Sequence, residues 1–180
     1  MYASRCNYGI CLLALVLTLA LMGAGWAQTA TPTPTPTAPD PANLYRQAVA
    51  LLEEAEQQLT AGNLSSALSL VKQSNALFTR LQKESAAKLA EHQLTSQESQ
   101  QLAINQKLAE EAQAKADGLL STAAAKKKEA EELRNKGQAE AGDAAERESK
   151  EQYLQVQTLS IKSATYALRN QQIIFRFLAP

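Results

Sequence analysis

The feature that most constrains this chain is its lack of helix breakers after the first 40 residues. Between Pro41 and Pro180 there is no proline, and Ala, Leu, Gln, Glu and Lys, all strong helix formers, dominate the stretch. β-Branched and aromatic residues do not alternate with polar ones anywhere in it, so strands are not expected. The sequence predicts an all-α fold of two antiparallel helical hairpins, a short one over 41–94 and a long, coiled-coil-like one over 95–180.

The short hairpin is predicted from its helix ends and its apolar spacing. Asp40 followed by Pro41 is typical of an N-cap and a first helical turn. Gly62 is expected to end the first helix in a left-handed conformation, and Asn63 to cap the second. The second helix is expected to bury one apolar face, made of Leu64, Ala67, Leu68, Val71, Phe78 and Leu81.

The long hairpin is predicted from a capping box and an alanine-rich seam. Thr95-Ser96-Gln97-Glu98 fits a capping box, which favours a break or kink near Thr95, with one continuous helix as the alternative. The seam has Leu or Ala at most of its positions, although Asn105 and Lys126 interrupt it. Its positions are 102, 105, 109, 112, 116, 119, 123, 126, 130 and 133.

The turn of the long hairpin is expected between Gly137 and Gly142, with Asp143 capping the last helix. Folding the chain back there places Leu159 near Leu120. The tip of such a hairpin carries many charges and little apolar bulk, so it should project into solvent and open easily.

The last helix has two apolar stripes. The first, Leu154, Ile161, Leu168 and Phe175, recurs every seven residues and best matches the seam of the long hairpin. The second is a candidate partner face, made of Val156, Leu159, Tyr166, Ile173 and Phe177. A helix that is apolar on two sides needs two neighbours. Either it lies at the centre of the chain's own bundle, or one stripe meets a protein partner or a second copy.

The N-terminal part is built like an export signal. Residues 1–27 combine Arg5, an uncharged apolar run over 10–24 and the small-residue end Gly25-Trp26-Ala27, which predicts a cleaved signal peptide. The alternative is an uncleaved segment that anchors the chain in a membrane. Residues 28–40 form a Thr/Pro-rich linker. The protein is therefore expected in the periplasm or outside the cell, and cleavage would remove both of its cysteines.

No catalytic, cofactor-binding or metal-binding motif stands out. His92 is the only histidine and has no cysteine or carboxylate cluster at metal spacing. The three lysines at 126–128 are followed at once by acidic residues, as on a solvated helix face, so nucleic-acid binding is not expected. The chain also lacks a phosphate loop and a nucleophile elbow. These features indicate a non-catalytic protein without cofactors.

One segment resembles a known family. Gly62-Asn63-Leu64-Ser65-Ser66-Ala67, with Ala55 before it, is similar to the turn between the two helices of a tetratricopeptide repeat, over residues 44–78. In that family, small residues at the positions of Ala55, Gly62 and Ala67 let the helices pack closely. The family's peptide-binding groove needs tandem copies, and this chain has a single one.

These features predict an exported interaction or scaffold protein of the bacterial cell envelope. Its partner would be another protein or a second copy, bound through the last helix. The alternative is a periplasmic holdase-type chaperone, whose helical arms would hold unfolded clients.

Overall fold

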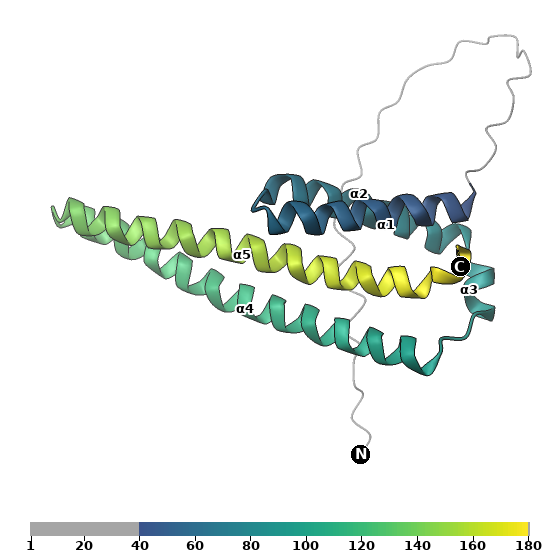
Figure 1. The fold of residues 1–180 in the computed structure, drawn as a ribbon. Helices are drawn as coiled ribbons and strands as arrows, with labels where there is room; N and C mark the ends of the chain where they lie inside the picture. Colours follow the sequence, from purple (N-terminus) through teal and green to yellow (C-terminus); the bar gives the residue numbers. More distant parts are fainter. Residues whose placement is uncertain (1–39, 180) are drawn as a thin grey trace, which may run out of the picture. The chain divides into compact units, whose positions relative to one another are not determined.

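A computed structural model describes residues 40–179. This part of the chain holds no strand, which confirms the all-α prediction. The α1 and α2 helices form the short hairpin, and α4 and α5 form the long one (Figure 1). The elements are α1 (Pro41–Thr60), α2 (Leu64–Glu84), α3 (Ala86–Glu91), α4 (Ser96–Asn135), α5 (Ala139–Ile174) and the 3₁₀ turn η2 (Arg176–Leu178). The predicted signal peptide, 1–27, and the linker up to residue 39 lie outside the described residues.

The ends of the short hairpin follow the sequence closely, with one exception. The Oδ1 of Asp40 accepts a hydrogen bond from the backbone N–H of Ala42 at 3.2 Å, as expected of an N-cap. Gly62 has a φ of +79°, the left-handed conformation predicted for the end of α1. Asn63 occupies the N-cap position of α2, but its side chain donates to Oε1 of Gln58 at 2.8 Å and makes no capping bond.

The break near Thr95 is confirmed, together with its capping box. The Thr95 Oγ1 accepts from the backbone N–H of Glu98 at 3.2 Å, and the Glu98 carboxylate accepts from the backbone N–H of Thr95 at 2.9 Å. A second interruption at Ser85, between α2 and α3, was not predicted.

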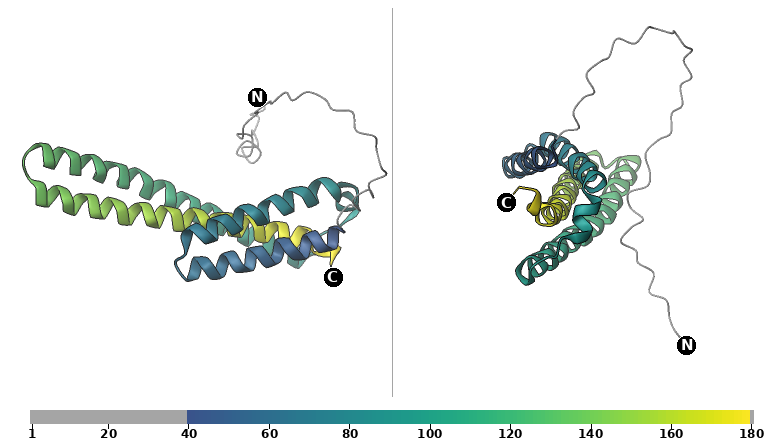
Figure 2. Two further views of the ribbon diagram at one scale, coloured as in Figure 1. Left: turned by 90° about the horizontal axis from the view of Figure 1, so that it is seen from above. Right: turned by 90° about the vertical axis from the view of Figure 1, so that its right-hand side faces the viewer.

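Helix α5 belongs to the long hairpin and also carries the short hairpin on its surface. The short hairpin packs on one face of α5, and α4 packs on another (Figures 1 and 2). Neither α1 nor α2 packs against α4 to a similar extent. Helix α5 thus has two neighbours within the chain itself, the short hairpin and α4.

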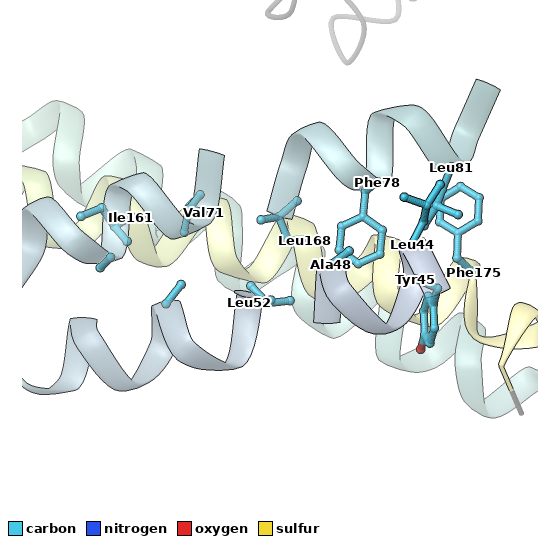
Figure 3. Close-up of a cluster of buried hydrophobic side chains, with 12 residues drawn as sticks. Leu44, Tyr45, Ala48, Leu52, Val71, Phe78, Leu81, Ile161, Leu168 and Phe175 are labelled. Atoms are coloured by element: carbon cyan, nitrogen blue, oxygen red, sulfur yellow. The ribbon is translucent and has the colours of Figure 1, made fainter. Parts of the chain in front are cut away.

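The apolar stripe of α5 with a seven-residue repeat faces the short hairpin. Ile161, Leu168 and Phe175 are buried in one cluster with residues of α1 and α2 (Figure 3), and Phe175 stacks on Phe78 with ring centroids 6.2 Å apart. The prediction that this stripe forms the seam of the long hairpin is therefore wrong. Leu154 has the same heptad position but is 56% exposed. The prediction for Leu68 is also wrong, because this side chain is 42% exposed.

The α4 side of the long hairpin is the predicted alanine seam. Its buried residues all fall on predicted seam positions; they are Asn105, Ala109, Ala112, Ala116, Ala123 and Ala130. Against them α5 places small or polar residues that reach the backbone of α4. Three side chains of α5 donate to α4 carbonyl oxygens: Ser149 Oγ to Ala123 at 2.9 Å, Ser163 Oγ to Ala109 at 2.9 Å, and Asn170 Nδ2 to Leu102 at 3.2 Å.

These three bonds define one constant antiparallel register. The three donors follow one another along α5 at intervals of two heptads and one heptad. Their acceptors lie at the same intervals along α4, in the opposite direction. One heptad further toward the turn, the register pairs Gly142 with Ala130. A Cβ atom on Gly142 would lie 2.8 Å from Cγ of Arg134 and 3.0 Å from the carbonyl oxygen of Ala130. Gly142 therefore permits a close approach of the two helices.

The prediction of a turn between Gly137 and Gly142 is wrong, because Gly142 serves the packing of α5 on α4 and not the turn. Gly142 and Asp143 lie inside α5, which begins at Ala139, and the turn is made around Gly137, with a φ of +77°. The turn thus comes half a heptad earlier than expected, which shifts the pairing of α5 with α4 by one heptad. Leu159 is paired with Gln113 instead of Leu120.

The part of the long hairpin beyond the short one, residues 117–155, is here called the arm. Its α4 segment extends about 28 Å at 1.5 Å per residue. Its buried residues are all small: Ala123, Ala130, Gly142, Ala145 and Ser149. Such residues bury little apolar area, so the arm is the part of the described chain that should open most easily.

Ion pairs join the two helices near the tip of the arm. Lys126 Nζ lies 3.2 Å from Oε2 of Glu148, and Arg134 pairs with Asp143 at 2.7 Å and with Glu146. Hydrogen bonds from Lys150 and Arg134 lower the pKa of Glu146 to about 2. Because these groups are exposed to solvent, such pairs add little to stability.

The close approach at Gly142 can be tested with a matched pair of glycines. Gly142→Ala should destabilise the arm by about 1 kcal/mol, because overpacking against Arg134 and Ala130 outweighs the gain in helix propensity. Gly118→Ala should stabilise it by up to about 1 kcal/mol, because a Cβ on Gly118 meets no atom within 4 Å. Hydrogen exchange of the arm amides measures both changes. Equal protection gained in both variants would show that Gly142 is not a contact point.

The orientation of the α5 stripe can be tested at two leucines of one heptad position. Leu168→Ala should lower the free energy of unfolding by about 2–4 kcal/mol, because the side chain is buried against the short hairpin. Leu154→Ala should change it by less than about 0.5 kcal/mol. Urea denaturation followed by circular dichroism gives both values. A similar loss in both variants would contradict the orientation described here.

Candidate interaction site

An open cleft follows the flank of α5 between α1 and α4. It exists because these two helices pack on different faces of α5 and not on each other. The cleft, here called the α1–α4 cleft, has a volume of about 510 Å³. It is lined by Tyr45 and Glu56 of α1, Gln101 and Asn105 of α4, Tyr166, Arg169, Gln172 and Ile173 of α5, and Arg176 just beyond α5.

All three guanidinium nitrogens of Arg169 have hydrogen-bond partners within the chain. Its Nε lies 2.9 Å from Oε1 of Glu56, its Nη2 also contacts this carboxylate, and its Nη1 donates to Oε1 of Gln172 at 2.6 Å. The hydrogen bond to Glu56 raises the pKa of Arg169. This ion pair ties α1 to α5 and cancels one positive and one negative charge in the cleft.

Tyr45 forms the boundary between the core and the cleft. Its ring belongs to the core cluster, and Figure 3 shows its hydroxyl pointing away from the buried side chains. The hydroxyl donates to the carbonyl oxygen of Gln172 at 3.3 Å. Burial raises the pKa of Tyr45, so the phenol remains protonated at neutral pH.

Other polar groups of the cleft have hydrogen-bonding capacity to spare. Asn105 is only 7% exposed; its Oδ1 accepts from Nε2 of Gln101 at 3.0 Å, while its own NH₂ group has no protein acceptor within residues 40–179. The exposed guanidinium of Arg176 forms no ion pair with any described residue. The same part of the chain offers no hydrogen-bond partner to the hydroxyl of Tyr166.

This arrangement suits binding better than proton transfer. The one carboxylate among the lining residues, Glu56, is held by Arg169, and the uncommitted groups are mainly hydrogen-bond donors. Within residues 40–179, no three His, Cys, Asp or Glu side chains come together as a metal ion would require.

The five residues of the predicted partner face are all half-buried, and they lie in several places. Tyr166 and Ile173 lie in the α1–α4 cleft. Phe177 stacks on His92, with ring centroids 4.5 Å apart. Val156 lines a different groove, against α2. The structure thus brings two of the five together at one site.

The groove at Val156 is apolar and lies where the arm leaves the short hairpin. Its volume is about 410 Å³. Leu64 and Leu68 of α2 and Val156, Ile161 and Ala164 of α5 provide its apolar lining. Leu68 is the most exposed apolar side chain of this groove and lies outside the core cluster.

Sequence reasoning missed most residues of the α1–α4 cleft. Tyr45, Gln101 and Arg176 come from three separate segments and carry no common pattern. Asn105 was the one available signal, since it places a polar side chain in an otherwise apolar seam.

None of the helices described over residues 40–179 is long and apolar enough to cross a membrane. No protein-family model, curated protein or solved structure matches the chain.

Proposed function

We propose that this protein is a non-catalytic, exported interaction protein of the bacterial cell envelope that holds a partner protein on its last helix. The observation that best supports the proposal is the open flank of α5. Both hairpins use α5 as their common support, yet the α1–α4 cleft leaves part of it accessible with unused hydrogen-bond donors. A shared helix with one open flank is well suited to present a fixed binding surface.

Export to the periplasm or the cell exterior is part of the same proposal. It rests on the signal-like sequence of residues 1–27, and the membrane would be involved only if this segment is retained. The likeness of residues 44–78 to a tetratricopeptide hairpin fits an interaction role. Ala55 and Ala67 are fully buried and Gly62 is left-handed, as close packing of such a hairpin requires.

A holdase-type chaperone is the second candidate. The apolar groove at Val156 and the exposed Leu68 and Leu154 favour it, because a holdase needs accessible apolar surface. The arm itself offers mainly alanine and balanced charge. We therefore rank the specific interaction protein first.

A photo-cross-linking experiment separates the two candidates. A photoreactive amino acid at Gln101, on the rim of the α1–α4 cleft, should capture one discrete partner in intact cells. The same amino acid at Lys115 is the control, because it lies two heptads along α4, is also exposed and is outside the cleft. Product bands are compared by mass.

The purified protein should also fail to suppress aggregation of a denatured client at equal concentration. A broad ladder of cross-links at both positions, together with clear suppression of aggregation, would establish the chaperone instead. The absence of any cross-linked protein at either position would contradict both.

A further inference from the structure

Among the residues that line the α1–α4 cleft, positive charges outnumber negative ones by one. Two arginines and one glutamate line it, and Arg169 is paired with Glu56. Arg176 is left without an ion pair among the described residues. A guanidinium is always charged at physiological pH, so Arg176 is available to pair with an anion.

Asn105 adds a hydrogen-bond donor from α4 to the cleft. It interrupts an alanine seam and is more than nine-tenths buried as a residue. Its Oδ1 is used by Gln101, but its NH₂ group lines the cleft without a protein acceptor in the described part of the chain. This NH₂ group is available to an acceptor atom in the cleft.

The uncommitted donors come from three different segments. Asn105 lies on α4, Tyr166 on α5, and Arg176 follows α5. Amide, phenol and guanidinium together suit an oxygen anion. A single net charge matches a carboxylate better than a phosphate dianion, and 510 Å³ is within the usual size range of ligand pockets.

We propose that the α1–α4 cleft binds a carboxylate of a partner peptide, with Arg176 as its ion-pair partner and Asn105 and Tyr166 as hydrogen-bond donors. The inference rests on the proposed interaction role, since it names the chemistry of the partner. An acidic side chain and a free C-terminus both supply this group.

The test uses the purified protein and four probes, followed by NMR of the Asn105 and arginine side-chain nitrogens. The probes are acetyl-Gly-Glu-Gly-amide, acetyl-Gly-Gln-Gly-amide, acetyl-Gly-Gly-Gly with a free carboxylate, and inorganic phosphate. The glutamate peptide, the free-carboxylate peptide or both should cause saturable shifts, and comparing them identifies the source of the carboxylate. The glutamine peptide should cause none, and phosphate should bind more weakly.

Two variants and one control assign the binding to the cleft. Arg176→Gln should weaken binding about tenfold or more, because it removes a charged hydrogen-bond donor. Asn105→Ala should also weaken it, and it continues the alanine seam, so the fold is retained. Arg147→Gln is the control, because Arg147 is an exposed arginine of α5 outside the cleft. Circular dichroism verifies that each variant is folded.

Equal affinity of Arg176→Gln and the parent protein would overturn the inference, as would a lack of saturable shifts or tighter binding of phosphate. These results leave the proposed function standing if Gln101 still captures a discrete partner. If the peptides bind but no partner is captured, carboxylate binding in the cleft is supported and the proposed interaction function is refuted.

Discussion

The structure depends on how closely α5 approaches the backbone of α4. Ser149, Ser163 and Asn170 each donate to a carbonyl oxygen of α4, at whole-heptad intervals. Such contacts are possible only where the facing residues are small, which the alanine seam provides. The short hairpin repeats the arrangement once, since Oγ of Ser74 donates to the carbonyl oxygen of Ala48 at 2.8 Å. These directional bonds select one register, which apolar contacts between alanines alone would specify poorly.

The register decides what each face of α5 can do. Once the small and polar face meets α4, the stripe with Ile161, Leu168 and Phe175 is free to build the core with the short hairpin. The two sets of neighbours then leave a flank of α5 uncovered, and this flank becomes the α1–α4 cleft. The same small residues explain the arm, where the seam between α4 and α5 continues past the short hairpin without large apolar side chains. Rigid support near the cleft and a weakly held arm thus have a common origin.

Much of the fold was predictable from the sequence, because helix formers, caps and the alanine seam are local signals. The partner of each α5 stripe was not predictable, because a seven-residue repeat identifies one face of a helix but not its neighbour. The predicted register was wrong because of Gly142. A glycine can serve a left-handed turn, as at Gly137, or a close approach of two helices, and the sequence does not distinguish these two roles. The cleft was missed because Tyr45 and Arg176 come together only when α5 lies between the short hairpin and α4.

Cysteine cross-linking tests the central claim, the register of α5 on α4, most directly. In a chain with Cys6 and Cys11 replaced by serine, cysteines are placed at Ser149 and Ala123, the pair joined by a hydrogen bond. A second chain places them at Ser149 and Ala130, which would be neighbours if the register were shifted by one heptad, as in the predicted turn. The account predicts rapid disulfide formation in the first chain and very little in the second. Preferential formation in the second chain would contradict the register, and with it the placement of α5 and the α1–α4 cleft.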